Sequence, residues 1–319
     1  MYTLMFLLMC MAAFLPFFIG GKNFVWGAGV EDGLSQHFSA LAYYGELLRE
    51  FVKNLIAGHP KLMMWNMSLG YGADVIATLN YYAIGDPLNL LYGFVPVKYT
   101  EIMYNFMILL RMYLAGIAFI LYARKMKKRT YGTVIGALAY VFCGFCFRLG
   151  LRHPFFLNPM IYFPLLCLGI EKIYQKQRPY LFIVMICVSA ISNYYFFYML
   201  TIFSVIYAWI RFYKYTEKDR IKNFFLTILK FGGYYILGIC MAAVILIPSV
   251  IGFLGNGRYG SGTDWKTLLV YPGKYYLMFL ENFVGYGNVG SNTNTGYLPI
   301  VGIVAVSYTH LTLPTTSRV

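Results

Sequence analysis

The sequence predicts an all-α polytopic membrane protein, a bundle of transmembrane helices. Of the 319 residues, 60% are hydrophobic and 12% are charged, about half the charged fraction of an average soluble domain. A chain with so little polar surface cannot cover itself in water, so we expect the lipid bilayer to be its solvent. The net charge of +14 does not indicate nucleic-acid binding, because the basic residues lie in short runs between apolar segments, as topology signals do.

Apolar segments recur along the chain at lengths that suit a bilayer, which takes about 20 residues to cross. They predict seven complete spans and the beginning of an eighth, at roughly 2–20, 101–123, 131–147, 155–171, 180–192, 195–212, 224–252 and from 297 onward. The first segment has no basic n-region and no small-residue cleavage site, so we interpret it as a span and not as a signal peptide.

Three basic connectors predict the orientation of the spans. Segments 123–130 and 211–222 contain five Lys or Arg residues each, and segment 171–179 contains three. The positive-inside rule assigns all three to the cytoplasm. This assignment requires the stretch 180–212 to cross the membrane twice, with a turn near residues 192–197.

The same orientation places the remaining long connections outside the cytoplasm. They are residues 21–100, 148–154 and 253–296. Because connecting segments on a rigid scaffold commonly carry function, we expect the chemistry to lie in the first and longest of them.

The end of the sequence differs from the rest. The eighth span stops after about half the apolar length that a crossing needs, and the Thr-rich stretch 307–319 follows it. We expect residues 1–306 to form the N-terminal part of a larger transmembrane domain. We interpret residues 307–319 as a non-native tail and exclude them from the fold.

The first outer segment contains a predicted amphipathic helix that begins after Asp32 and Gly33. The helix is about 22 residues long, ends at Gly58 and Pro60, and should lie along the outer membrane surface. Its apolar side consists of Leu34, Phe38, Leu41, Leu48, Phe51, Val52 and Leu55.

Asp32 at the head of this helix allows two interpretations. Asp is a preferred N-cap residue, and its charge is favourable at a helix N-terminus. A carboxylate at this boundary is equally suited to accept the proton of a hydroxyl group. The neighbouring Glu31 can act in the same way or be a solvated interfacial charge.

Three motifs in this segment resemble those of the bacterial YfhO-type membrane proteins. They are D-G-x-S-Q-H at 32–37, W-N-x-x-x-G-x-G-A-D at 65–74 and Y-Y-x-x-x-D-P-L-N at 81–89, and the resemblance extends from residue 1 to about 300. That family is similar in architecture to the GT-C glycosyltransferases, which take a sugar from a polyprenyl-phosphate carrier and attach it to an acceptor outside the membrane. The resemblance implies a GT-C-like helix bundle in the bacterial cell membrane, with a cell-envelope polymer such as a teichoic or lipoteichoic acid as the acceptor.

The resemblance also implies a catalytic acidic residue just after the first span, a position that Asp32 occupies. Glu31 stands where a less acidic neighbour is expected, so the resemblance does not decide between the two carboxylates. Such a transfer needs a base for the acceptor hydroxyl and cationic groups around the phosphate.

Several other residues are candidates for binding the substrate. Arg148, Arg152 and His153 lie in the second outer segment and can bind the carrier phosphate or lipid headgroups. His37 can contact the substrate, and Arg111 inside a span can line a lipid-phosphate groove or pair with a neighbouring helix. Asp74 and Asp86 can contact the acceptor or, with Asp32, hold a divalent cation, the one cofactor candidate, although Asp86-Pro87 is equally typical of a turn.

Two further functions remain open. A transporter or flippase of a lipid-linked sugar is one, and Arg111 is the feature that favours it, because transporters carry ionisable groups at mid-membrane. A non-catalytic cell-envelope assembly protein is the other. The concentration of polar residues in the outer segments favours the enzyme.

Overall fold

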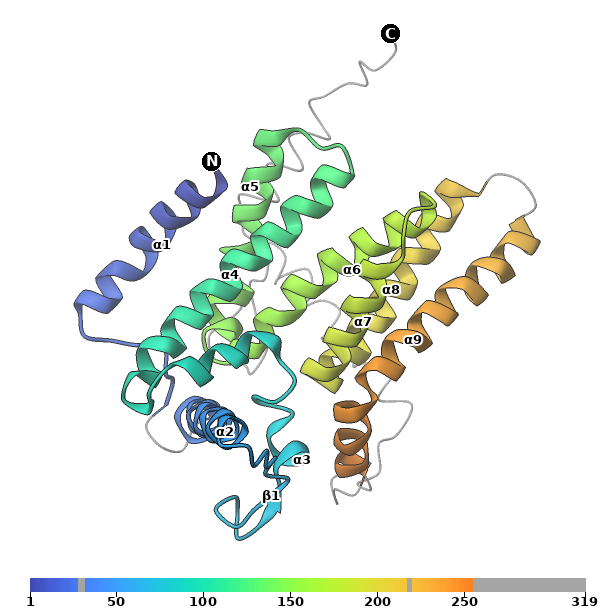
Figure 1. The fold of residues 1–319 in the computed structure, drawn as a ribbon. Coiled ribbons are helices and arrows are strands. Elements are labelled where there is room, and N and C mark those ends of the chain that lie inside the picture. Colours follow the sequence, from blue (N-terminus) through green and yellow to red (C-terminus); the bar gives the residue numbers. More distant parts are fainter. Residues whose placement is uncertain (28–31, 217–219, 255–319) are drawn as a thin grey trace, which may run out of the picture.

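The chain is a bundle of helices whose axes run between two ends, with a smaller helical layer covering one end (Figure 1). A computed structural model describes residues 1–27, 32–216 and 220–254. The helices of the bundle are α1 (Tyr2–Ile19), α4 (Thr100–Lys125), α5 (Thr130–Val141), α6 (Asn158–Tyr174), α7 (Tyr180–Ser192), α8 (Tyr194–Tyr215) and α9 (Arg220–Leu254). The predicted class, an all-α polytopic membrane protein, is confirmed.

Five of these helices match predicted spans in length and composition, whereas the helix in the predicted span 131–147 already ends at Val141. Within the described part of the chain, α1, α4, α6, α8 and α9 are long and apolar enough to cross a bilayer, and α5 and α7 are shorter apolar helices. The predicted outer segment 253–296, the span from 297 and the tail 307–319 fall, except at residues 253 and 254, outside the described residues.

The stretch 180–212 forms two helices, as the orientation requires. Asn193 separates α7 from α8 with an extended backbone, and its side-chain Oδ1 accepts hydrogen bonds from the N–H groups of Tyr195 (3.1 Å) and Phe196 (3.2 Å). This is an N-cap, which satisfies two of the amide groups that a helix start leaves unpaired. The predicted turn near 192–197 is confirmed.

The basic connectors gather at one end of the bundle (Figure 1). Lys125, the last residue of α4, donates a hydrogen bond to the side chain of Gln177 before α7, with 3.1 Å between Nζ and Oε1. Arg211 near the end of α8 lies against the sulfur of Met126 in the first connector. The structure therefore places the three connectors on the same side, the side that the positive-inside rule assigns to the cytoplasm.

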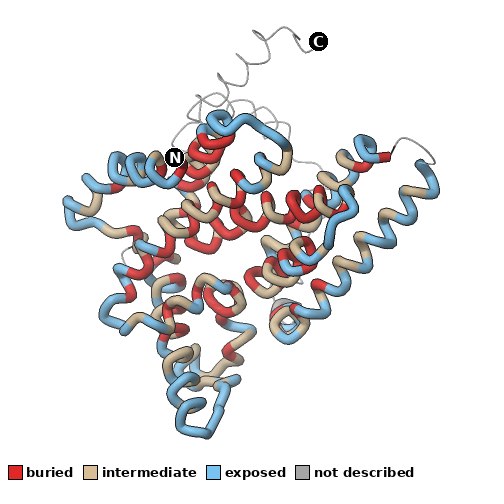
Figure 2. Tube along the Cα trace, turned by 45° about the horizontal axis from the view of Figure 1, so that its top comes forward, coloured by how far each residue is buried: buried red, intermediate tan, exposed pale blue. Residues whose placement is uncertain are grey.

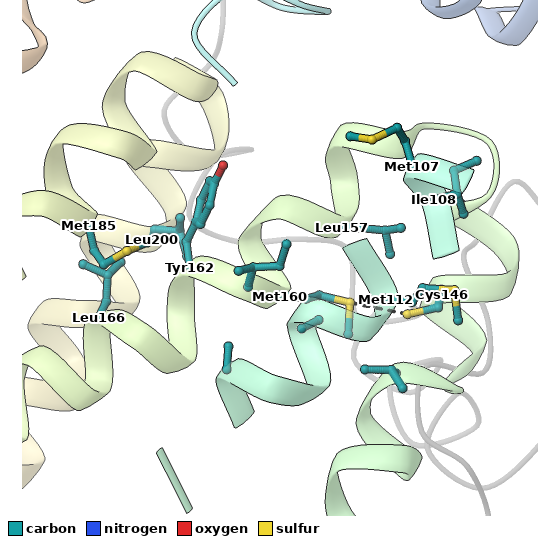
Figure 3. Close-up of a cluster of buried hydrophobic side chains, with 14 of the residues drawn as sticks. Met107, Ile108, Met112, Cys146, Leu157, Met160, Tyr162, Leu166, Met185 and Leu200 are labelled. Carbon is teal, nitrogen blue, oxygen red and sulfur yellow. Dashed lines mark hydrogen bonds between the residues drawn. The ribbon is translucent and has the colours of Figure 1, made fainter. Parts of the chain in front are cut away.

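The buried core lies along α4 and α6 (Figures 2 and 3). Of the most apolar stretch of α6, 78% of the residues are buried, against 17% in α8 and in α9. The exposed side chains of α8 and α9 are mostly large and apolar, which suits helices that face lipid. Cys146 packs in this core with its sulfur 3.5 Å from that of Met160 and 3.9 Å from that of Cys143.

The opposite end carries residues 21–100 and 148–154, as far as they are described, which the sequence predicts to be outer segments. They contain a π-helical turn η1 (Gly33–Phe38), α2 (Ser39–Ile56), the paired strands β1 (Trp65–Asn66) and β2 (Ala73–Asp74), α3 (Val75–Leu79), the 3₁₀ turns η2 (Pro87–Phe94) and η3 (Val97–Tyr99), the π turn η4 (Cys146–Gly150) and the 3₁₀ turn η5 (Pro154–Leu157). The predicted amphipathic helix is confirmed as η1 continued by α2, and it ends just before Gly58, whose φ is +79°. Leu41 is buried, whereas Val52 and Leu55 are exposed, so the far half of the apolar side is available to the membrane surface.

We predict that the two ends of the bundle face opposite sides of the membrane. In a cysteine-free background, Lys61→Cys in the outer segment should react with a membrane-impermeant maleimide in intact cells. Lys128→Cys in the first connector should react only after permeabilisation. Labelling of position 128 in intact cells, with position 61 protected, would reverse the orientation.

Candidate functional site

Asp32 heads the π turn η1, yet its carboxylate does not cap the helix. The backbone of Asp32 is already helical, and its side chain makes no hydrogen bond to the first amide groups. Instead, Oδ1 accepts a hydrogen bond from Nε2 of Gln36 (2.7 Å), and Oε1 of Gln36 accepts one from the hydroxyl of Tyr82 (2.6 Å). The capping interpretation is therefore wrong. The half-buried carboxylate is held by the side chain of Gln36, which Tyr82 holds in turn.

Gly33 fixes the start of this helix against the end of the preceding segment. A Cβ atom at position 33 would lie 2.1 Å from the carbonyl oxygen of Trp26, and the amide of Leu34 donates to that same oxygen at 3.0 Å. Only glycine permits so close an approach. The guanidinium of Arg152 lies 4.1 Å above the centre of the Trp26 ring, an arrangement that attracts the cation to the ring face.

His37 and His153 join the two outer segments directly. Nε2 of His37 lies 2.6 Å from Nδ1 of His153, and His37 is 3% exposed. One hydrogen bond between two ring nitrogens takes one proton, so this contact is lost when both rings are charged and each carries an N–H group at it. Burial, and then the neighbouring His153, lower the pKa of His37 to about 3.

His153 responds to charges on both sides of the site. Burial lowers the pKa of His153, the Asp32 carboxylate opposes this shift, and the Arg152 guanidinium adds to it. Asp32 also acts with burial and with the neighbouring tyrosines to raise the pKa of Tyr81 to about 12. The carboxylate therefore lies within electrostatic reach of both His153 and Tyr81.

Aromatic rings surround these polar groups. The Tyr82 ring lies 5.4 Å from the ring of His37, and the Phe155 ring lies 5.2 Å from it on another side. Tyr81 contacts Tyr82 and Phe155, with both ring-centre distances at 5.1 Å. Flat apolar faces with hydroxyl groups at their tips suit a ligand that is polar at its edges and apolar on its faces.

The structure brings together four of the residues predicted from sequence and adds others. Asp32, His37, Arg152 and His153 meet at one place, whereas Arg148 is exposed on η4 and Glu31 lies outside the described residues. Gln36, Trp26, Tyr81 and Tyr82 were not predicted. Gln36 had a signal, because a residue four positions after another lies on the same helix face. Tyr81 and Tyr82 begin the motif at 81–89, and Trp26 had no signal.

Arg111 and Asp86 pair with each other away from this site. Nη2 of Arg111 lies 2.7 Å from Oδ2 of Asp86, and the two side chains are 1% and 3% exposed. Arg111 is about 16 Å along α4 from Thr100, at the helical rise of about 1.5 Å per residue. The outer segment that carries Asp86 therefore enters the bundle. Arg111 pairs with this segment, whereas the sequence predicted that it lines a lipid-phosphate groove or pairs with a neighbouring helix.

The amide groups around this ion pair satisfy both charges. Arg111 donates to the side-chain oxygens of Asn158 (2.9 Å) and Asn89 (2.6 Å), and Asn158 donates to Asp86 (2.8 Å). Asp86 also accepts from the amide of Leu88 at 2.9 Å, which agrees with the predicted turn. Both of its carboxylate oxygens are engaged inside the core, so a contact with an acceptor or a metal would need this network to open.

Asp74 has a local role as well. Its Oδ1 accepts from the amide of Ala77 at 2.6 Å, and it caps α3. Among the residues that the structure describes, no group of three or more His, Cys, Asp or Glu side chains could hold a metal ion. The predicted cluster of Asp32, Asp74 and Asp86 therefore does not form, because two of the three carboxylates are used within the fold.

Comparisons with known proteins give one family. A family model described as bacterial membrane protein YfhO matches residues 1–316. A protein of Bacillus subtilis (strain 168), named Uncharacterized protein YfhO, is 34% identical over 143 residues. That match covers 44% of this chain and 16% of the relative. No solved structure matches the chain.

We predict that Arg111→Met lowers the free energy of unfolding by about 3–5 kcal/mol, because it leaves the Asp86 carboxylate buried without its partner. The measurement is the melting temperature of the detergent-purified protein, read as the temperature at which half of the protein is lost from its size-exclusion peak. Arg129→Met, which removes an exposed arginine, is the matched control and should melt like the wild type. Equal melting of the Arg111 and Arg129 variants would contradict a structural role for the pair.

We predict that the His37–His153 contact weakens in acid. The pKa of His37 is lowered to about 3 in the folded protein, so between that value and the ordinary value of about 6.5 the unfolded chain binds more protons. Stability is therefore full above about pH 6.5 and falls by about 1.4 kcal/mol for each pH unit below it.

The test compares melting temperatures of wild type and His37→Phe from pH 8 to pH 5. The variant should lack the part of the acid-induced loss that the imidazole causes. An identical pH dependence in both proteins would show that His37 is not held neutral.

Proposed function

The chain belongs to the YfhO family of bacterial membrane proteins, and from this premise we propose that it carries the catalytic loop of a glycosyltransferase. The enzyme would take a sugar from a polyprenyl-phosphate carrier and attach it to a cell-envelope polymer, such as a teichoic or lipoteichoic acid, outside the cytoplasm. The GT-C-like architecture and the bacterial plasma membrane are parts of this proposal.

One observation carries the proposal, the Asp32 carboxylate that does not cap its own helix. A structural Asp at a helix start normally uses its oxygens on the first amide groups. Here the carboxylate is oriented by Gln36, which leaves acceptor capacity for an incoming hydroxyl group. A base must be within hydrogen-bond reach of the proton that it removes, and this placement supports that role.

In the proposed reaction the acceptor hydroxyl oxygen forms a bond to the anomeric carbon. The bond from that carbon to the phosphate oxygen breaks, its electron pair stays on the departing polyprenyl phosphate, and the hydroxyl proton passes to Asp32. A single displacement of this kind inverts the anomeric carbon. Glu31 remains an alternative base within the proposal.

The groups around Asp32 support binding of the donor. Arg152 supplies a fixed positive charge on the Trp26 ring, and Arg148 is exposed on the turn just before it. Either can stabilise the charge that develops on the phosphate. Neutral His153 can donate one hydrogen bond to the same group, and Tyr81 and Tyr82 offer ring faces for the sugar.

The alternatives receive less support from the site. Arg111 was the feature in favour of a transporter or flippase of lipid-linked sugars, and its charge is neutralised by Asp86 in the core. A non-catalytic assembly protein has no need of a carboxylate at a helix start that does not cap its own helix. The enzyme accounts for more of the observed side chains than either.

We predict that Asp32→Asn lowers sugar transfer by the full-length protein about 100-fold or more, since general-base catalysis typically contributes 10²–10⁴-fold. The assay is transfer from a radiolabelled polyprenyl-phosphate sugar in proteoliposomes. Asp74→Asn removes another outer carboxylate and should keep most of the activity. Unchanged transfer in Asp32→Asn would remove Asp32 from its role, and carrier movement without transfer by the wild type would support the flippase.

A further inference from the structure

A pocket of about 470 Å³ lies at the connector end of the bundle, opposite the candidate functional site. It opens between the last turn of α6, the end of α8 and the first turns of α9. Its lining consists of Ile173, Tyr174, Lys176, Tyr215, Thr216, Asn223, Leu226, Thr227, Lys230 and Phe231.

The described residues of the lining carry a net positive charge. Lys176 and Lys230 contribute from two different walls, and none of the described lining residues is acidic. Neither lysine makes a salt bridge within the described ranges. The nearby Arg211 does not add to this charge, because it pairs with the buried carboxylate of Glu171, with 3.0 Å between Nη2 and Oε2.

The wall of the pocket on α8 is held rigidly. The hydroxyl of Tyr215 donates to Oε2 of Glu171 at 2.8 Å and accepts from Gln175 at 3.1 Å. The rings of Tyr174 and Tyr215 stack with 5.1 Å between their centres and 6° between their planes. The lysines therefore face a preformed polar surface, which lowers the entropy cost of binding.

The depth of the pocket matches the lipid headgroups. Lys230 is the last charged residue of α9, and the uncharged stretch from Phe231 to Leu254 follows it. That stretch is long enough to cross the hydrocarbon layer, which takes about 20 residues. Lys230 therefore lies at the boundary between hydrocarbon and headgroups, with the apolar side chains of Leu226 and Phe231 beside it in the lining.

We propose that this pocket binds the phosphate headgroup of an anionic phospholipid from the connector-side leaflet. Lys176 and Lys230 contact the phosphate, Thr227 lies where it can hydrogen-bond the headgroup, and the apolar residues contact the upper acyl chain. Basic pockets between helices on the cytoplasmic side of membrane proteins bind such headgroups. The apolar part of the lining favours a lipid over free phosphate. This site is independent of the proposed transferase activity.

The test measures binding of short-chain phosphatidylglycerol to the detergent-purified full-length protein by thermophoresis. Lys176→Gln with Lys230→Gln should weaken binding about 30-fold, because each Lys near an anionic surface contributes about 1 kcal/mol and 1.4 kcal/mol is tenfold. The control, Lys128→Gln with Lys222→Gln, removes two exposed lysines from the same end outside the lining. It should change binding less than threefold, and both proteins should melt like the wild type without lipid.

Two probes separate the sources of the anion. Short-chain phosphatidylcholine, which has no net charge, should bind at least tenfold more weakly than phosphatidylglycerol. Inorganic phosphate at millimolar concentration should not displace the lipid. Equal weakening in the pocket and control variants, or displacement by inorganic phosphate, would overturn the proposal.

Discussion

The ion pair between Arg111 and Asp86 is the constraint on which much of the outer architecture depends. Two opposite charges in a low-dielectric core are stable only with excellent geometry and with their remaining hydrogen bonds satisfied. Asn158 on α6 and Asn89 on η2 supply those bonds. The outer segment must therefore enter the bundle deeply enough to meet the middle of α4. Gly85 permits this entry, because its φ is +90° and a Cβ there would lie 1.8 Å from the carbonyl oxygen of Ile191.

This anchoring has a consequence for the candidate site. Asn80 and Asn193 bond the same segment to the end of α7, through the Ile191 and Tyr81 carbonyl oxygens at 3.0 Å and 3.1 Å. Tyr81 and Tyr82 lie between these anchors and the ion pair, so their rings are held toward His37 and Phe155. A site on connecting segments gains precision when those segments are fixed to a rigid scaffold. The buried pair thus contributes to the site without belonging to it.

Local sequence patterns predicted the long helices and the end of the bundle at which each described connection lies. Apolar length gave the spans, the basic connectors required the turn at Asn193, and helical spacing gave η1 and α2. Because 21–100 and 148–154 were assigned to one side, Asp32, His37, Arg152 and His153 were expected at the same end. The Arg111–Asp86 pair was not predicted, because periodicity within a segment carries no information about how far a connection enters the bundle. The failure of Asp32 to cap had no signal either, since cap geometry depends on backbone angles that composition does not fix.

The neutral histidine pair limits how charge can be distributed in the proposed reaction. Burial, and then the neighbouring His153, keep His37 uncharged at neutral pH, so His37 can orient a group but cannot neutralise a phosphate. That task falls to arginine, which keeps its charge in any protein environment. Arg152 lies on the Trp26 ring, and Gly33 holds Trp26 at the start of the helix that carries Asp32. The cation is therefore held at Trp26, and the contact between Trp26 and Gly33 holds it near the start of η1, where Asp32 lies. Both charges are close enough to His153 to shift the pKa of its imidazole, the carboxylate upward and the guanidinium downward. A base and a phosphate-binding cation that are held together in this way can keep a constant separation while substrates enter and leave. The proposed displacement requires such a separation, because the reacting carbon lies between the hydroxyl oxygen and the phosphate.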